Sequence, residues 1–134
     1  MGLEQVKTLD LPVVSDVRGN LAVAEGVTLP FAIARAYWLY DVPAGSTRGG
    51  HAHRRLQQVL IALSGSFDVV LDDGRVRKTV SLNRPDRGLY LPRGIWRELE
   101  NFSAGAVCLV LASEPYDESE YVRDYGEFLA LSGK

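Results

Sequence analysis

The stretch GSTRGGHAHRRLQQVLIALSG, residues 45 to 65, combines a glycine-bearing turn, two histidines one residue apart and an apolar run that ends at Gly65. Residues i and i+2 of a β-strand point to the same face, so a strand would deliver His51 and His53 side by side into one space. They are the only two histidines in the chain. Imidazole exchanges protons near neutral pH, so this pair is the first candidate for proton or metal chemistry.

The composition is typical of a folded protein. The 134 residues are 46% hydrophobic and 24% charged. A chain of this length buries roughly two thirds of its unfolded surface, so we expect one domain that spans residues 1–134. The net charge of −2 gives no electrostatic case for a nucleic-acid partner.

Nothing in the sequence signals a membrane or secretion. No apolar run approaches the roughly 20 residues that cross a bilayer, and the N-terminal MGLEQVKTLD lacks the apolar centre of a signal peptide. We therefore expect a cytoplasmic protein with no membrane partner. The only cysteine, Cys108, lies in an apolar run, which predicts a buried, unreactive thiol.

Most of the chain reads as short strands divided by turn residues. Val76 to Leu82 alternates apolar and polar side chains, and Asp72-Asp73-Gly74 before it is a hairpin signal. About nine or ten such strands favour an all-β fold, an antiparallel sandwich or barrel. The expected strands cover residues 9–14, 21–25, 31–42, 51–53, 56–63, 67–71, 76–82, 89–91, 95–99 and 107–111.

Only the tail changes its period. Asp117 with Glu120 three residues later is similar to a capping box, which predicts one amphipathic helix over residues 118–131. We expect its aromatic stripe to pack against the sheet. The stripe consists of Tyr121, Tyr125, Phe128 and Leu129.

Two motifs resemble those of the cupin superfamily. Gly45, His51-Ala52-His53, Gln58 and Gly65 have the spacing of the first cupin motif, and the segment from Pro92 to Arg97 followed by Asn101 is similar to the second. Cupins are small jelly rolls, which agrees with the strand count. The resemblance implies a single cupin-type jelly roll, an antiparallel double-sheet barrel, with a short C-terminal helix.

The departures from the cupin motifs argue against a metal. Gln58 stands where metal-binding cupins have glutamate, and Arg97 stands where they have a third histidine. A stable site for a transition metal needs three or four ligands such as imidazole or carboxylate, whereas an amide is a poor ligand and a guanidinium repels a cation. We therefore expect neither a metal nor another cofactor. Two adjacent imidazoles without metal are acid-base groups, at least one of them neutral near pH 7.

A narrower resemblance covers nearly the whole chain in register. It is to the sugar 3,4-ketoisomerases, which act on dTDP-4-keto-6-deoxyglucose in the biosynthesis of deoxysugars for bacterial surface polysaccharides and natural products. It implies a homodimeric, metal-free isomerase that moves the ketone from C4 to C3. The segments that carry it are Arg18-Gly19-Asn20-Leu21, Leu29-Pro30-Phe31 with Arg35 and Tyr37, RGGHAH, Asp72-Asp73-Gly74, Ser81-Leu82-Asn83-Arg84-Pro85, Gly88-Leu89-Tyr90, and Tyr116-Asp117-Glu118 through Arg123-Asp124-Tyr125.

That reaction needs a base at C3, donors for an enediolate and an acid at C4. We expect His51 to be the principal base or proton shuttle. His53 would relay protons or orient the substrate, and the sequence does not separate these roles. Tyr37 would be a hydroxyl donor or second acid if its strand face looks into the barrel; packing in the core is the alternative.

The anionic nucleotide sugar also needs cations. Guanidinium groups match diphosphate oxygens, and the candidates are Arg35, Arg48 and Arg97, of which Arg97 has the strongest claim to the interior. Arg18 lies in a turn that could fold over the mouth. The neutral hydrogen-bond candidates are Gln58 and Asn83, while Trp96 could stack on thymine or sugar or pack in the core.

Two other functions remain open at this point. One is a 3,5-epimerase of the same nucleotide sugars, which also uses a jelly roll but pairs a histidine with an aspartate, an arrangement not found here. The other is a non-catalytic cupin that binds a sugar or nucleotide. The face on which C4 is protonated, which sets the product's configuration, depends on placements that spacing does not reveal.

Overall fold

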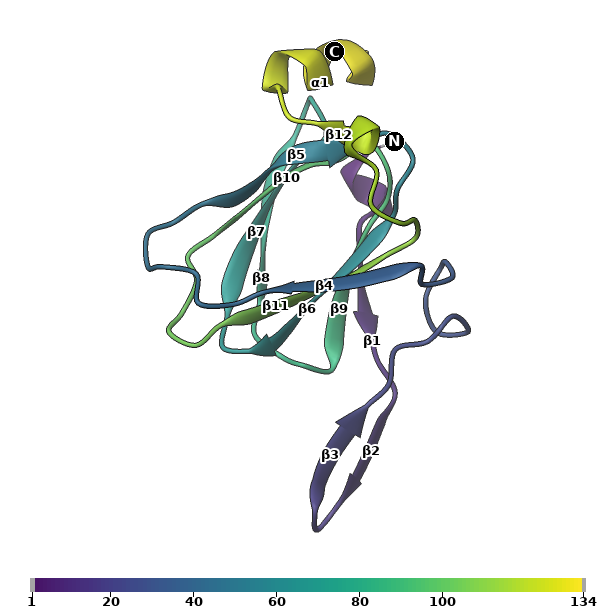
Figure 1. The fold of residues 1–134 in the computed structure, drawn as a ribbon, viewed down its shortest axis with the longest axis vertical. Helices are drawn as coiled ribbons and strands as arrows, with labels where there is room; N and C mark the ends of the chain where they lie inside the picture. Colours follow the sequence, from purple (N-terminus) through teal and green to yellow (C-terminus); the bar gives the residue numbers. More distant parts are fainter. Residues whose placement is uncertain (1, 134) are drawn as a thin grey trace.

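Two five-stranded antiparallel sheets face each other in the computed structural model, which describes residues 2–133 (Figure 1). The first sheet has the order β1 (Lys7–Asp10), β9 (Arg87–Leu91), β6 (Gln58–Ser64), β11 (Val107–Ala112) and β4 (Arg35–Leu39). The second has the order β12 (Tyr121–Val122), β5 (Arg48–His53), β10 (Trp96–Glu100), β7 (Phe67–Asp72) and β8 (Arg77–Leu82). This is the expected jelly roll.

The remaining elements lie at opposite ends of the barrel (Figure 1). A hairpin of β2 (Val13–Asp16) and β3 (Gly19–Ala22) extends away at one end. The short helix α1 (Tyr125–Ser132) covers the other end, and two 3-10 turns, η1 (Leu3–Gln5) and η2 (Glu118–Glu120), complete the chain. Across residues 2–133, no helix has the length and apolar character needed to cross a bilayer.

The apolar run of β6 is buried on both faces, which explains why it does not alternate. Leu60 and Ala62 point into the core between the sheets, while Val59 and Ile61 pack in a second cluster with Leu111 and with the loops outside the first sheet. Cys108 lies in the inner core as expected, where burial raises the pKa of its thiol to about 12. A strand with one solvent-exposed face alternates apolar and polar residues, whereas a strand that is buried on both faces is apolar throughout.

Two predicted strands were wrong in extent. Residues 9–14 do not form one strand: the chain leaves the first sheet after Asp10 and enters the hairpin at Val13, because Pro12 has no N–H to continue a ladder. The predicted strand 31–42 shrinks to Arg35–Leu39. Phe31 instead packs on the outer cluster of the first sheet, next to Tyr90.

The predicted C-terminal helix is confirmed, but it begins at Tyr125 rather than at residue 118. Asp117 caps only the 3-10 turn η2, accepting a hydrogen bond from the backbone N–H of Ser119. The next two residues pair as β12 with Ala52 and His53 of β5, and α1 begins only after the cap at Asp124. Tertiary strand pairing has overridden the helical spacing of the aromatic residues.

Gly65, the last residue of the opening stretch, turns the chain from β6 into β7 in the left-handed region at φ +65°. A Cβ there would lie 2.4 Å from Oγ of Ser103 and 2.8 Å from Cα of Ala106. Gly105 has a similar φ of +71° but nothing within 4 Å of a Cβ. The two positions therefore share the backbone strain and differ in the space available.

We expect Gly65→Ala to lower the free energy of unfolding by about 2–3 kcal/mol and the matched control Gly105→Ala by about 1 kcal/mol, since only the first adds a clash to the strain. Urea unfolding of both variants measures the difference. Equal losses would show that the surroundings of Gly65 yield without resistance.

Candidate active site

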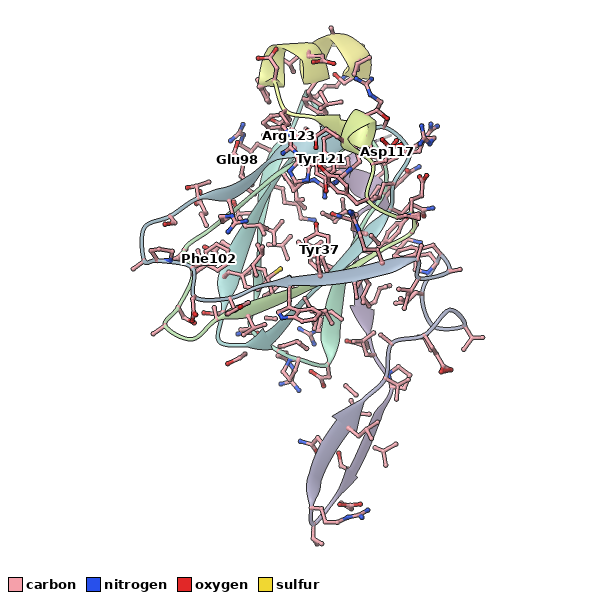
Figure 2. All side chains as sticks on the ribbon, viewed as in Figure 1. Tyr37, Glu98, Phe102, Asp117, Tyr121 and Arg123 are labelled. Atoms are coloured by element: carbon pink, nitrogen blue, oxygen red, sulfur yellow. The ribbon has the colours of Figure 1, made fainter. Side chains whose placement is uncertain are left out.

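A cavity of about 340 Å³ lies between the two sheets and opens beside β12. Figure 2 shows Tyr37 rising from β4 into this space, with Tyr121 and Arg123 at its rim. Its floor is apolar, formed by Leu39, Leu60, Leu99 and Val110. Its polar lining consists of Tyr37, Arg48, His51, Gln58, Arg97, Tyr121 and Arg123.

The two histidines form a hydrogen-bonded pair in the wall of this cavity. As i and i+2 residues of β5 they point inward together, and their Nε2 atoms are 3.1 Å apart. The rings meet edge to face, with centroids 4.7 Å apart. His51 borders the cavity and is 9% exposed, whereas His53 lies behind it and is 1% exposed.

Both imidazoles are neutral at pH 7. Burial, and then the charge of Arg97, lowers the pKa of His51 from 6.5 to about 3. The same causes, in the same order, lower the pKa of His53. A neutral imidazole is a competent base, and a hydrogen bond between two neutral rings requires that one Nε2 carries the proton and the other accepts it.

Among residues 2–133, the Nδ1 of His53 is buried without a hydrogen-bond partner, so the ring of His53 is held through the contact between the Nε2 atoms. The two neutral rings are in opposite tautomers, one protonated at Nε2 and the other at Nδ1.

Arg97 is a buried cation without a carboxylate partner. Strand pairing sets it directly opposite His51, and it is 2% exposed. Its Nε and Nη2 donate to the carbonyl of Ile95 at 3.1 and 3.0 Å. Burial lowers the pKa of Arg97 to about 10, so it stays charged at pH 7. Within residues 2–133 it makes no ion pair, and an unpaired charge of this kind favours an anion beside it.

Gln58 connects Arg97 to Tyr37. Nη1 of Arg97 donates to Oε1 of Gln58 at 2.5 Å, and Nε2 of Gln58 donates to the hydroxyl oxygen of Tyr37 at 3.1 Å. Burial raises the pKa of Tyr37, so the phenol keeps its proton. Because the hydroxyl oxygen already accepts a bond, its O–H is left to donate into the cavity.

The donor set does not fit a metal. Among residues 2–133 no group of three or more histidine, cysteine, aspartate or glutamate side chains is arranged to hold an ion. The amide oxygen of Gln58 accepts a hydrogen bond from the guanidinium of Arg97. The fixed positive charge of Arg97 beside the two imidazoles disfavours the binding of a metal cation there.

Two further arginines lie near the cavity. Arg48 lines it and is exposed. Arg35 at the start of β4 lies between two aromatic rings, with its Cζ 5.1 Å from the centroid of Tyr37 and 5.5 Å from that of Tyr116. Its Nε and Nη2 are buried and have no hydrogen-bond partner among residues 2–133, so they are available to a ligand.

Residues 4–133 match the family model described as FdtA: WxcM-like, C-terminal. The chain belongs to this family. It is 42% identical over 123 residues to the TDP-4-oxo-6-deoxy-alpha-D-glucose-3,4-oxoisomerase of Aneurinibacillus thermoaerophilus, an alignment that covers 91% of this chain and 88% of the relative.

Two solved structures of ketoisomerases superpose on this FdtA family member over almost their whole length. One is a 3,4-ketoisomerase from Helicobacter canadensis, with 46% identity, a TM-score of 0.94 and coverage of 97% and 98% of the two chains. The other is a histidine-to-asparagine mutant of the 3,4-ketoisomerase QdtA from Thermoanaerobacterium thermosaccharolyticum in complex with TDP-4-keto-6-deoxyglucose. It has 39% identity, a TM-score of 0.95 and coverage of 98% and 96%.

Five of the ten predicted site residues of this FdtA family member line the cavity, namely Tyr37, Arg48, His51, Gln58 and Arg97. His53 lies behind His51 and Arg35 lies beside Tyr37, whereas the other three lie away from the cavity. Arg18 lies at the tip of the β2–β3 hairpin, where its only ion pair within residues 2–133 is with Asp16 at 2.6 Å. Asn83 is exposed after β8. Trp96 points out of the barrel and packs against α1, as in the core alternative, with its ring 5.7 Å from that of Phe128.

Two residues that line the cavity, Tyr121 and Arg123, were not predicted as site residues from the sequence. The helical spacing of the tail placed Tyr121 in an amphipathic helix, although in β12 it faces both histidines. Tyr121 and Arg123 are i and i+2 residues, the same spacing as in the histidine pair. This period-2 signal was present, but a strand of two residues is too short to be recognised from its pattern.

The buried histidines predict a specific loss of stability in acid. Because their pKa is lowered in the fold, the unfolded chain binds protons first when the pH falls below 6.5. The free energy of unfolding is therefore fully retained above pH 6.5 and declines toward pH 3, by up to about 1.4 kcal/mol per pH unit for each histidine. Urea unfolding between pH 5 and 7 measures the slope. The double variant His51→Asn/His53→Asn should flatten it, and an unchanged slope would contradict the assignment.

Proposed function

We propose that this chain is a TDP-4-keto-6-deoxyglucose 3,4-ketoisomerase, which moves the sugar ketone from C4 to C3. The observation that carries the proposal is a pair of neutral imidazoles in a cavity that also holds an unpaired, buried guanidinium. A base beside a fixed positive charge suits abstraction of a proton next to a carbonyl. The FdtA family membership and the ketoisomerase relatives, at 42% and 46% identity, support the same reaction.

His51 is the base in this proposal because it borders the cavity. It takes the proton of C3, the electron pair forms a C3–C4 double bond, and the C4 oxygen becomes anionic. C4 then gains a proton, the C4 oxygen is protonated to a hydroxyl and the hydroxyl at C3 gives up its proton. The ketone therefore ends at C3 with no net gain or loss of protons or electrons. His53 supports this exchange through the 3.1 Å hydrogen bond between the Nε2 atoms.

Arg97 and Tyr37 stabilise the anionic intermediate. The guanidinium is charged, fixed by the Ile95 carbonyl and by Gln58, and has no competing carboxylate within residues 2–133. The phenol proton of Tyr37 is free to donate to the same oxygen or to act as the acid at C4. Donors fixed before the reaction need no reorganisation when charge develops.

The cavity of about 340 Å³ suits the hexose rather than the whole nucleotide sugar. We place the diphosphate at its rim, where Arg48 and Arg123 line the opening. Arg35 nearby has two buried nitrogens, Nε and Nη2, without hydrogen-bond partners in the described part of the chain. Guanidinium groups bind phosphate oxygens through paired hydrogen bonds. The thymidine would then lie outside the barrel.

Incubation with TDP-4-keto-6-deoxyglucose in deuterated water tests the function. We expect NMR to show the 3-keto isomer with deuterium at C4, and the coupling at C4 gives the protonated face. His51→Asn should lower kcat by about 10²–10⁴-fold because the base is lost. Arg84→Gln, a surface change at the Asp86 ion pair, is the matched control with full activity.

The two alternative functions, a 3,5-epimerase and a non-catalytic cupin, predict different results in the same experiment. A 3,5-epimerase would place deuterium at C5 with the ketone still at C4. A non-catalytic cupin would bind the nucleotide sugar, before and after His51→Asn, without any turnover. Either result would contradict the ketoisomerase proposal.

We also propose that the protein is a homodimer. The β2–β3 hairpin projects from the barrel, and an isolated two-stranded hairpin is marginally stable in water (Figure 1). It exposes Val14 at 63% and Leu21 at 58%, while the edge strand β4 exposes Trp38 at 57%. Exposed apolar groups of this size on an edge strand and on a protruding arm favour burial against a second copy.

Light scattering after size-exclusion chromatography tests the dimer. We expect wild-type protein at twice the chain mass and the double variant Val14→Asp/Leu21→Asp at the chain mass, since buried carboxylates would oppose association. Val76→Asp, at a valine of similar exposure (58%) outside the hairpin, is the control that should stay dimeric. A monomeric wild type would disprove this proposal and leave the catalytic one standing.

A further inference from the structure

Tyr121 packs against both histidines at once. Its ring centroid lies 5.0 Å from that of His51 and 4.6 Å from that of His53, and the two imidazoles are 4.7 Å from each other. The three rings thus form a triangle in which each touches the other two. A third ring in contact with both imidazoles restricts the rotation of each about its side-chain bonds.

The backbone fixes Tyr121 in this place independently of its ring. Tyr121 is the residue of β12 that pairs with His53 of β5. Just before it, the carboxylate of Glu120, 1% exposed, accepts hydrogen bonds at 2.7 Å from the backbone N–H groups of Arg55 and Leu56. The turn that follows the histidines is therefore tied to the segment that carries the tyrosine.

Arg123 also contacts the ring of Tyr121. Its Cζ lies 4.3 Å from the ring centroid of Tyr121, within the range of a cation–π contact. Glu118 holds the guanidinium through two hydrogen bonds, at 3.0 and 3.1 Å. The tyrosine ring therefore contacts both imidazoles and a fixed cation.

The pair of imidazoles needs such a support. A hydrogen bond between neutral groups contributes about 1 kcal/mol, which is similar to the rotamer entropy lost when a side chain is fixed. Within residues 2–133 the Nδ1 of His53 has no hydrogen-bond partner to hold the ring from its other end. Packing against a rigid neighbour supplies the missing restraint.

We propose that Tyr121 is a positioning residue, which holds the two imidazoles at hydrogen-bond distance in opposite tautomers and keeps water away from them. The proposal builds on the function given above, since it explains how the base is kept in place. It concerns the state of the histidines before any substrate binds, so it can be tested without turnover.

The charged and titratable groups around the histidines come from several strands. Arg97 of β10, Arg35 of β4 and Arg123 after β12 all oppose protonation of His53, and Arg97 and Arg123 do so for His51. The phenols of Tyr37 and Tyr121 complete the lining. Loss of the tyrosine ring would admit water, which weakens both the burial and these charges.

NMR of the intact protein labelled with ¹⁵N in the imidazole rings tests the proposal. The chain has two histidines, so each ring gives one unambiguous spin system. In the wild type we expect one Nδ1–H and one Nε2–H ring, neither titrating between pH 5 and 8. In Tyr121→Ala we expect averaged tautomers and titration closer to pH 6.5, whereas Tyr121→Phe should keep the wild-type pattern.

Tyr125→Ala is the matched control. Tyr125 belongs to the same C-terminal segment but packs on Trp96 outside the barrel, with ring centroids 5.3 Å apart. Its loss should leave both tautomers unchanged. Tyr121→Leu, which keeps most of the volume, should show the same change as Tyr121→Ala in a smaller degree and serves if the alanine variant does not fold.

Three results would overturn the positioning role: fixed tautomers in both Tyr121→Ala and Tyr121→Leu, an equal change in Tyr125→Ala, or loss of the pattern in Tyr121→Phe. On the proposed substrate, Tyr121→Ala should lower kcat by about 10²-fold, and its kcat should fall further as the pH drops toward 6. Tyr121→Phe should retain the wild-type kcat and pH dependence. If the wild type does not turn over this substrate, the function is wrong, and the NMR spectra still decide the positioning role.

Discussion

The pairing of β5 with β10 sets Arg97 opposite His51, and the chemistry of the cavity depends on this one contact between strands. Burial and a fixed positive charge keep both imidazoles neutral. The guanidinium in turn lacks a carboxylate within residues 2–133 and is fixed through Gln58 and the carbonyl of Ile95. A pair of neutral imidazoles beside a buried cation follows from that register.

The segment that closes this site comes from the end of the chain. Glu120 ties it to the turn after β5, Tyr121 packs on the histidines and Arg123 contacts the tyrosine. The elements of a jelly roll are distant in sequence, so a site between its sheets draws on many segments. Here residues from β4, β5, β6, β10 and the tail meet around a cavity of about 340 Å³.

Much of this arrangement could be predicted from the sequence. The spacing of the histidines, with Gln58 and Arg97 in place of metal ligands, pointed to acid-base chemistry. In the structure the histidines form one hydrogen-bonded pair and Arg97 and Gln58 form another, and strand pairing sets Arg97 opposite His51. The ends of elements were less predictable. Pro12 broke a predicted strand. The pairing of Tyr121 with His53 replaced the first half of the predicted helix, because a partner strand outweighs a weak local preference.

The sequence by itself determined the class of fold, the inward pair of histidines and the residue types that face them, since alternation along a strand and the identity of a side chain are local properties. Only the tertiary structure decided which groups meet. It placed Arg97 in the wall, Trp96 under α1, Arg18 on a distant hairpin and Tyr121 against the histidines. The physical reason is that burial and strand register, which set the protonation state of His51 and the exposure of every candidate, depend on residues far away along the chain.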